Sequence, residues 1–82
     1  MPLELADLRG HPARTIARQH KTAVETWLAD ALAAARVSSP RDRAREIMLL
    51  MEGAMALMLI HGDRGYATAA GRAAKTLVRK KV

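Results

Sequence analysis

Apolar residues recur at helical spacing over three stretches of the chain, and glycine, serine and proline separate these stretches. The pattern predicts helices over 12–36, 40–61 and 64–81, the first beginning at Pro12, a residue suited to the first helical position. No stretch shows the apolar and polar alternation of a strand. We therefore predict an all-α fold, a three-helix antiparallel bundle.

Local signals set the helix boundaries. Pro40 suits the first position of the second helix, with Ser39 as the expected cap and Asp42 as the acidic partner of a capping box. Gly62 is placed to take the left-handed conformation that ends a helix. Asp63 is the expected cap of the third helix.

The first helix has a single apolar face. We expect the following residues to face the core: Ala13, Ile16, Ala17, Ala23, Val24, Trp27, Leu28, Ala31 and Ala35. Polar residues occupy the opposite face: Arg14, Arg18, Lys21, Thr22 and Glu25. Such a helix is typical of a chain segment that packs on one core.

The second helix is apolar on two opposite sides. At about 100° per residue, one arc of roughly 80° holds Met48, Met51, Met55 and Met58. The other side holds Leu49, Leu50, Gly53, Ala56, Leu57 and Ile60. A helix that is apolar all round lies at the centre of a domain or between a domain and a partner. Because 82 residues do not surround such a helix, we expect an obligate dimer or a fragment.

The third helix has a bulky edge and a small edge. The bulky edge comprises Tyr66, Ala73 and Leu77, and the small edge comprises Ala67, Ala70, Gly71 and Ala74. Small side chains allow the backbones of two helices to approach closely, so this edge favours tight helix packing.

Composition narrows the function classes. The chain has no cysteine, which excludes disulfides and thiolate metal sites, and 2% aromatic residues, which excludes the stacking platform of single-strand nucleic-acid binders. The most apolar stretch, 47–60, contains Glu52 and is shorter than the roughly 20 residues of a membrane span. We expect a cytoplasmic protein that contacts no membrane, with one domain over 11–82 and a tail, or the end of a missing helix, over 1–10.

The net charge of +6 is concentrated in the last segment, since residues 62–82 hold six basic side chains and one acidic one. A solvated helix face with cations near its C-terminus explains this charge. The alternative is sequence-independent binding of nucleic acid. That interpretation uses Arg72, Lys75, Arg79, Lys80 and Lys81.

Catalytic chemistry is poorly represented. His11, His20 and His61 lack metal-ligand spacing, and Ser38 and Ser39 serve a turn. There is no cysteine nucleophile and no glycine-rich phosphate loop. We expect neither an enzyme nor a bound cofactor.

Three segments, in order, carry a resemblance to a known family: Met48-Leu49-Leu50-Met51-Glu52-Gly53-Ala54, His61-Gly62-Asp63 and Ala69-Ala70-Gly71-Arg72-Ala73-Ala74. Together they resemble the C-terminal regulatory domain of TetR-family transcriptional repressors. The segment His11-Pro12-Ala13-Arg14, which leads into Trp27-Leu28, resembles the preceding helix in one subgroup of that family. The resemblance covers most of residues 11–80.

The resemblance implies that the last two helices pair with those of a second subunit in a four-helix interface, while inner faces line a cavity for a small apolar inducer. The chain is then a dimerisation and ligand-sensing module of a TetR-like regulator. The helix-turn-helix domain of the family has no counterpart in this sequence, so direct sequence-specific DNA binding is not expected of the chain.

The helix faces give candidate residues for the dimer interface and for the ligand pocket. The expected dimer interface comprises Leu50, Gly53, Ala54, Leu57, Ile60, Ala67, Ala70, Gly71, Ala74 and Val78. The expected ligand pocket comprises His20, Trp27, Met48, Met51, Met55 and Met58, because the methionine side is the natural face toward the first helix.

Several alternatives stay open at this point. The methionines are either an adaptable ligand lining or ordinary core filling, and His20 either binds a ligand or is satisfied by a neighbour. Glu52 pairs with an arginine or a histidine, or lies at the edge of a groove reached by water. The rival function is a free-standing interaction protein that binds another protein through Leu50, Gly53 and Leu57.

Overall fold

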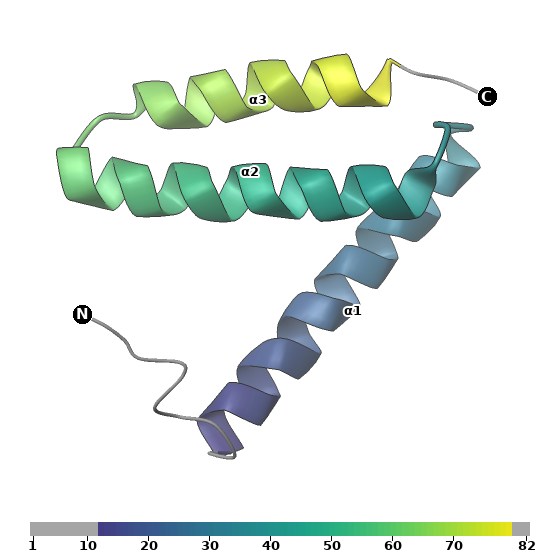
Figure 1. Ribbon diagram of the computed structural model, residues 1–82, viewed down its shortest axis with the longest axis horizontal. Coiled ribbons are helices and arrows are strands. Elements are labelled where there is room, and N and C mark those ends of the chain that lie inside the picture. The colour runs from purple at the N-terminus through teal and green to yellow at the C-terminus, as the bar shows by residue number, and fades with distance from the viewer. Residues whose placement is uncertain (1–11, 80–82) are drawn as a thin grey trace.

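The computed structural model describes residues 12–79 as three helices (Figure 1). They are α1 (Pro12–Ala34), α2 (Pro40–His61) and α3 (Gly65–Val78). Helices α2 and α3 run antiparallel as a hairpin, whereas α1 diverges from the start of α2 (Figure 1). The described residues contain no strand. The predicted all-α fold of three helices is confirmed.

The three helices form a single layer. Helix α2 lies in the middle and packs against both α1 and α3, and a view down the shortest axis shows the helices next to one another rather than stacked (Figure 1). The extents are 41 × 30 × 13 Å. The radius of gyration is 14.7 Å, whereas a compact chain of this length has about 12 Å. Both faces of the layer are therefore open.

The core is small and lies at the corner between α1 and α2. Four buried residues form it: Leu32, Val37, Ala44 and Ile47. Five partly buried side chains pack against it, two from α1 and three from α3: Leu28, Ala29, Ala74, Leu77 and Val78. Most of the length of α1 lies outside this cluster.

Helix α1 ends in a Schellman motif. The Val37 N–H donates to the Leu32 carbonyl at 3.0 Å, and the Arg36 N–H donates to the Ala33 carbonyl at 3.0 Å. Arg36 takes the left-handed position of the motif, with φ 65°, where glycine is usual. Val37 and Leu32 also belong to the core, so backbone hydrogen bonds and apolar packing fix the corner together.

The start of α2 differs from the prediction. Ser39 stands at the cap position but has φ 49° and makes no side-chain capping hydrogen bond. The expected capping box with Asp42 is therefore wrong, because a capping side chain needs an extended backbone at that position. The Ser39 carbonyl accepts the Arg43 N–H at 3.0 Å.

The end of α2 follows its sequence signal. Gly62 has φ 63° and its N–H donates to the Met58 carbonyl at 2.7 Å, so it ends α2 as predicted. At the start of α3 the cap position is Arg64, not the expected Asp63, and Arg64 makes no side-chain capping hydrogen bond. The Asp63 carboxylate accepts the Gly65 N–H at 2.8 Å in the turn before it. The predicted tail over 1–10 and the expected end of the third helix near Lys81 lie outside the described residues.

The orientation of α1 is the largest correction. Seven of the nine residues predicted to face the core are exposed, among them Ile16 at 65% and Trp27 at 69%. Its polar face instead meets α2, where Lys21 pairs with Glu52 and Glu25 lies 3.9 Å from Arg45. Periodicity identifies an apolar face but not the element that covers it, and only the last turns of α1 reach the core.

The left-handed Arg36 gives a stability prediction. The left-handed conformation costs a residue with a Cβ about 1–2 kcal/mol of conformational free energy. The Arg36 side chain is exposed, so its replacement loses no buried contact. We expect Arg36→Gly to raise the free energy of unfolding by about 0.5–1 kcal/mol after the extra entropy of glycine in the unfolded chain is counted.

Urea unfolding followed by circular dichroism at one protein concentration measures this change. The matched control is Ala33→Gly, three residues earlier in the last turn of α1, which we expect to cost about 1 kcal/mol. An Arg36→Gly variant that loses as much stability as the control contradicts the Schellman assignment.

Candidate interaction surfaces on the helical hairpin

One face of the α2–α3 hairpin carries an apolar groove of about 320 Å³, here called the methionine groove. Apolar residues and one glycine line it: Ile47, Leu50, Met51, Ala54, Met55, Met58, Ala67, Ala70, Gly71 and Ala74. Met51, Met55 and Met58 project together because their spacing is helical, and the small edge of α3 leaves room beside them. Met51 is 48% exposed and Met55 is 53% exposed.

The opposite face of the hairpin carries a second apolar hollow of about 370 Å³, here called the leucine surface. Its lining residues are Leu49, Leu50, Gly53, Ala54, Leu57, Tyr66, Ala69, Ala70 and Ala73. Through three of them the surface continues into a further hollow of about 600 Å³ that adds Glu46, Thr76 and Leu77. Leu49 is 69% exposed, so a large apolar area on this face faces solvent in the single chain.

The ten residues predicted for one dimer interface do not share one face. Gly53 and Leu57 belong to the leucine surface. Three residues of α3 belong to the methionine groove: Ala67, Gly71 and Ala74. Another three line both hollows: Leu50, Ala54 and Ala70. Ile60 is 72% exposed and Val78 packs against the corner core.

The residues predicted for one ligand pocket are also separated. Met51, Met55 and Met58 line a groove with α3 rather than with α1, and Met48 is buried. His20 and Trp27 are exposed on α1, and neither lines the methionine groove. Of the six residues predicted for the ligand pocket, the structure brings together Met51, Met55 and Met58.

Gly53 and Gly71 each lie inside a helix without an intramolecular reason to be glycine. A Cβ added at either position meets no atom within 4 Å. Glycine inside a helix costs about 0.5–1 kcal/mol relative to alanine. Sequence reasoning identified both positions as places of close approach, and among residues 12–79 no atom comes within 4 Å of a Cβ added at either position.

Charged pairs frame these apolar surfaces. Glu52 pairs with Lys21 of α1, not with the arginine or histidine expected from the sequence, and both side chains are about half exposed. Arg43 and Glu46 pair within α2, with Nε and Oε1 2.6 Å apart and a second contact of 2.9 Å between Nη2 and Oε2. These pairs define a polar rim.

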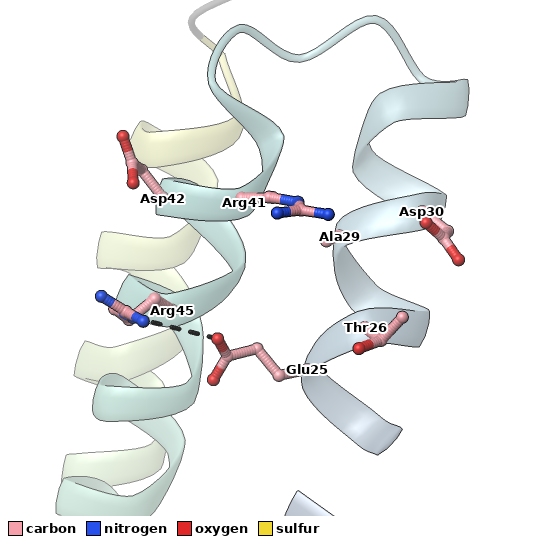
Figure 2. A pocket seen from close by; sticks show the side chains of 7 residues that line it. All are labelled: Glu25, Thr26, Ala29, Asp30, Arg41, Asp42 and Arg45. Atoms are coloured by element: carbon pink, nitrogen blue, oxygen red, sulfur yellow. Dashed lines mark ion pairs between the residues drawn. The ribbon is translucent and has the colours of Figure 1, made fainter. Parts of the chain in front are cut away.

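A polar cleft of about 410 Å³ lies between α1 and α2 near the corner (Figure 2). Arg41 extends from α2 toward α1, whereas Asp30 and Asp42 point away from each other (Figure 2). The ion pair between Glu25 and Arg45 crosses the cleft at 3.9 Å. Sequence reasoning missed this cleft because its charges come from two helices whose facing sides it had not identified. The ion pair joins α1 to α2 across this cleft.

At the other end of the hairpin, the rings of His61 and Tyr66 stack with centroids 5.5 Å apart and an angle of 24° between their planes. This contact spans the turn that joins α2 to α3. Over residues 12–79, no three histidine, aspartate or glutamate side chains lie close enough together to hold a metal ion. The hollows of the described hairpin are lined mainly by apolar side chains.

No protein-family model, curated protein or solved structure matches the chain. None of the described helices combines the length and the hydropathy needed to cross a membrane.

Proposed function

We propose that this chain is a self-association module of a TetR-like transcriptional regulator, in which two copies pack their leucine surfaces together as a four-helix interface. The observation that carries the proposal is Gly53. It lies near the middle of α2 on the leucine surface, where an added Cβ meets no atom within 4 Å. A glycine with no close neighbour among residues 12–79 fits close approach by a second chain.

Exposure of large side chains supports the same surface. On the leucine surface, Leu49 is 69% exposed and Leu57 is 38% exposed. Full burial of such a side chain stabilises by about 1.5–3 kcal/mol. In a symmetric contact each of these side chains is buried in both copies, so its contribution counts twice. This gain offsets part of the association cost of roughly 4–15 kcal/mol.

The geometry of α2 and α3 suits a four-helix contact. The two helices are antiparallel neighbours (Figure 1), and Ala69, Ala70 and Ala73 leave the α3 side of the surface shallow. The distance between packed helix axes is 8–10 Å and depends on the side chains at the contact, so small residues at the crossing allow the closer distances. Gly53 and these alanines supply them.

The expected consequence for regulation is that a ligand bound to this module shifts its helices and so moves an attached DNA-binding domain. The described helices are not proposed to bind operator DNA themselves.

The dimer is tested by matched glycine substitutions and sedimentation equilibrium. Leucine at position 53 projects from the leucine surface, so we expect Gly53→Leu to turn a dimer into a monomer. Gly71→Leu is the control, because Gly71 lies on the opposite face and also has no neighbour within 4 Å of an added Cβ. We expect Gly71→Leu to leave the dimer intact.

The other outcomes separate the rival functions. A wild-type chain that stays monomeric at high micromolar concentration contradicts self-association and favours an interaction protein with a different partner. Salt-sensitive binding of arbitrary DNA that is lost when Arg72 and Lys75 are neutralised favours the nucleic-acid interpretation.

A second function, sensing of a small apolar molecule, has one observation in its favour. The methionine groove is lined without any charged side chain or side-chain hydrogen-bond donor. Methionine side chains are flexible and polarisable, so they adapt to apolar ligands of different shape. The groove volume of about 320 Å³ lies at the small end of ligand sites, which are roughly 300–1,000 Å³.

Methionine-methyl NMR with octanol as the probe tests this function. We expect the resonances of Met51, Met55 and Met58 to move on titration, while that of the buried Met48 stays close to its starting position. Gly71→Leu fills part of the groove and should weaken the response, whereas Gly53→Leu should not. Resonances that do not move up to the solubility limit of octanol contradict the groove as a ligand site.

A further inference from the structure

The sulfur atoms of the methionine groove are a set of donor atoms that neither proposed function uses. Met51, Met55 and Met58 line the groove, where Met51 is 48% exposed and Met55 is 53% exposed. Met48, on the same helix, is 8% exposed and fills space in the interior. Filling of the interior therefore explains Met48, but it does not explain why three further methionines open into one hollow.

The three groove methionines are neighbours on one side of α2. Their positions differ by four and by three, so they lie within an arc of about 60° and span about 10.5 Å along the helix axis. Side chains at these spacings meet on the surface of a helix. Met55 lies between Met51 and Met58, so a single small ligand beside Met55 is within reach of all three thioethers.

Methionine side chains are long enough to bring the three sulfur atoms to one ion. Sulfur ligands of zinc lie about 2.3 Å from the metal, which sets three such ligands roughly 4 Å from one another. The sulfur atoms of Met51 and Met58 then each shift by about 3 Å toward Met55 along the helix axis. A side chain with three rotatable bonds makes this shift by changing its rotamer, without any movement of the backbone.

Helix α3 leaves space for an ion beside the thioethers. It contributes Ala67, Ala70, Gly71 and Ala74 to the groove, and a Cβ added at Gly71 meets no atom within 4 Å. The α3 side of the groove is therefore lined by side chains no larger than a methyl group. They keep the hollow of about 320 Å³ open next to the sulfur atoms.

The type of donor atom selects the class of ion. Thioether sulfur is a soft, uncharged ligand, which favours Cu⁺ and its analogue Ag⁺. Hard ions such as Mg²⁺ and Ca²⁺ take oxygen ligands, and none of the side chains that line the groove carries oxygen. The free-energy cost of placing an ion in apolar surroundings rises with the square of its charge, so a lining without charged residues favours a monovalent ion.

Charged side chains near the groove balance one another. The adjoining hollow at the turn shares two methionines with the groove and holds one acidic and one basic side chain, Asp63 and Arg64. Glu52 of α2 is paired with Lys21. Because these groups supply no net negative charge, the affinity for an ion has to come from the sulfur atoms, and it is therefore specific to soft ions.

We propose that the methionine groove binds a soft monovalent metal ion of the Cu⁺ class, with the sulfur atoms of Met51, Met55 and Met58 as its three ligands. This site goes beyond the sensing of an apolar molecule, because the ion binds to sulfur lone pairs rather than to apolar surface. One chain supplies all three ligands, so the site does not depend on pairing through the leucine surface.

Silver ion is the probe for this site, because Ag⁺ is as soft as Cu⁺ and keeps its oxidation state in air. The full chain, labelled at its methionine methyl groups, is titrated with silver nitrate in chloride-free buffer and followed by NMR and by isothermal titration calorimetry. The proposal predicts one strongly bound ion per chain and movement of the Met51, Met55 and Met58 resonances together. Resonances of these three residues that stay in place overturn it.

Leucine substitutions separate the sulfur atoms from the apolar surface. Leucine keeps the volume and the apolar character of methionine but has no donor atom, so Met51→Leu, Met55→Leu and Met58→Leu each remove one ligand. Loss of a side chain that only orients a metal ligand weakens metal affinity by about 10–100-fold, so we expect loss of a ligand itself to weaken Ag⁺ binding at least about tenfold. Met48→Leu is the matched control and should bind Ag⁺ as tightly as the wild type.

The variant with all three groove substitutions distinguishes the metal site from the apolar-ligand site. It should lose Ag⁺ binding but keep its response to octanol, read from the methyl group of Ala67, because its groove is still apolar. Circular dichroism checks that it stays helical, and the single variants decide the question if it does not. A wild type that binds Ag⁺ without responding to octanol contradicts the apolar-ligand function alone. Ag⁺ binding that persists in the triple variant overturns the proposal, because it belongs to the histidines: His11, His20 and His61.

Discussion

The constraint on which the rest of the structure depends is that α2 is apolar on two opposite sides while the chain forms only one layer of helices. Helices α1 and α3 cover the edges of α2 and leave both of its faces open. The methionine groove lies on one face and the leucine surface lies on the other. The buried cluster at the corner involves only Leu32, Val37, Ala44 and Ile47, which is a small core for three helices.

This arrangement explains why the surfaces have different characters. The methionine groove combines flexible side chains with the small edge of α3, so it is adaptable and suits small apolar molecules. The leucine surface combines exposed branched side chains with Gly53 and three alanines of α3, so it suits close contact with another helix pair.

Much of the fold could be predicted from the sequence because its signals are local. Helical periodicity indicates the three helices, and Gly62 and Asp63 act at the turn as their chemistry requires.

The orientation of α1 could not be predicted in this way. Lys21 and Glu25 find partners on α2 that only the folded chain brings near, and these pairs turn Ile16 and Trp27 outward. The left-handed backbone at Ser39 could not be predicted either, because a serine at a helix cap more often has an extended backbone. The split of the predicted interface between two faces follows from the position of α3, which places Ala67 and Gly71 beside the methionines rather than the leucines.

In the proposed dimer, the single layer of helices gains its stability from association with a second copy. Urea unfolding over a hundredfold range of protein concentration, followed by circular dichroism, measures this dependence. Because folding that is coupled to association responds to mass action, we expect the unfolding midpoint to rise with protein concentration. A cooperative transition whose midpoint is the same at every concentration would contradict it, because the layer would then be stable alone.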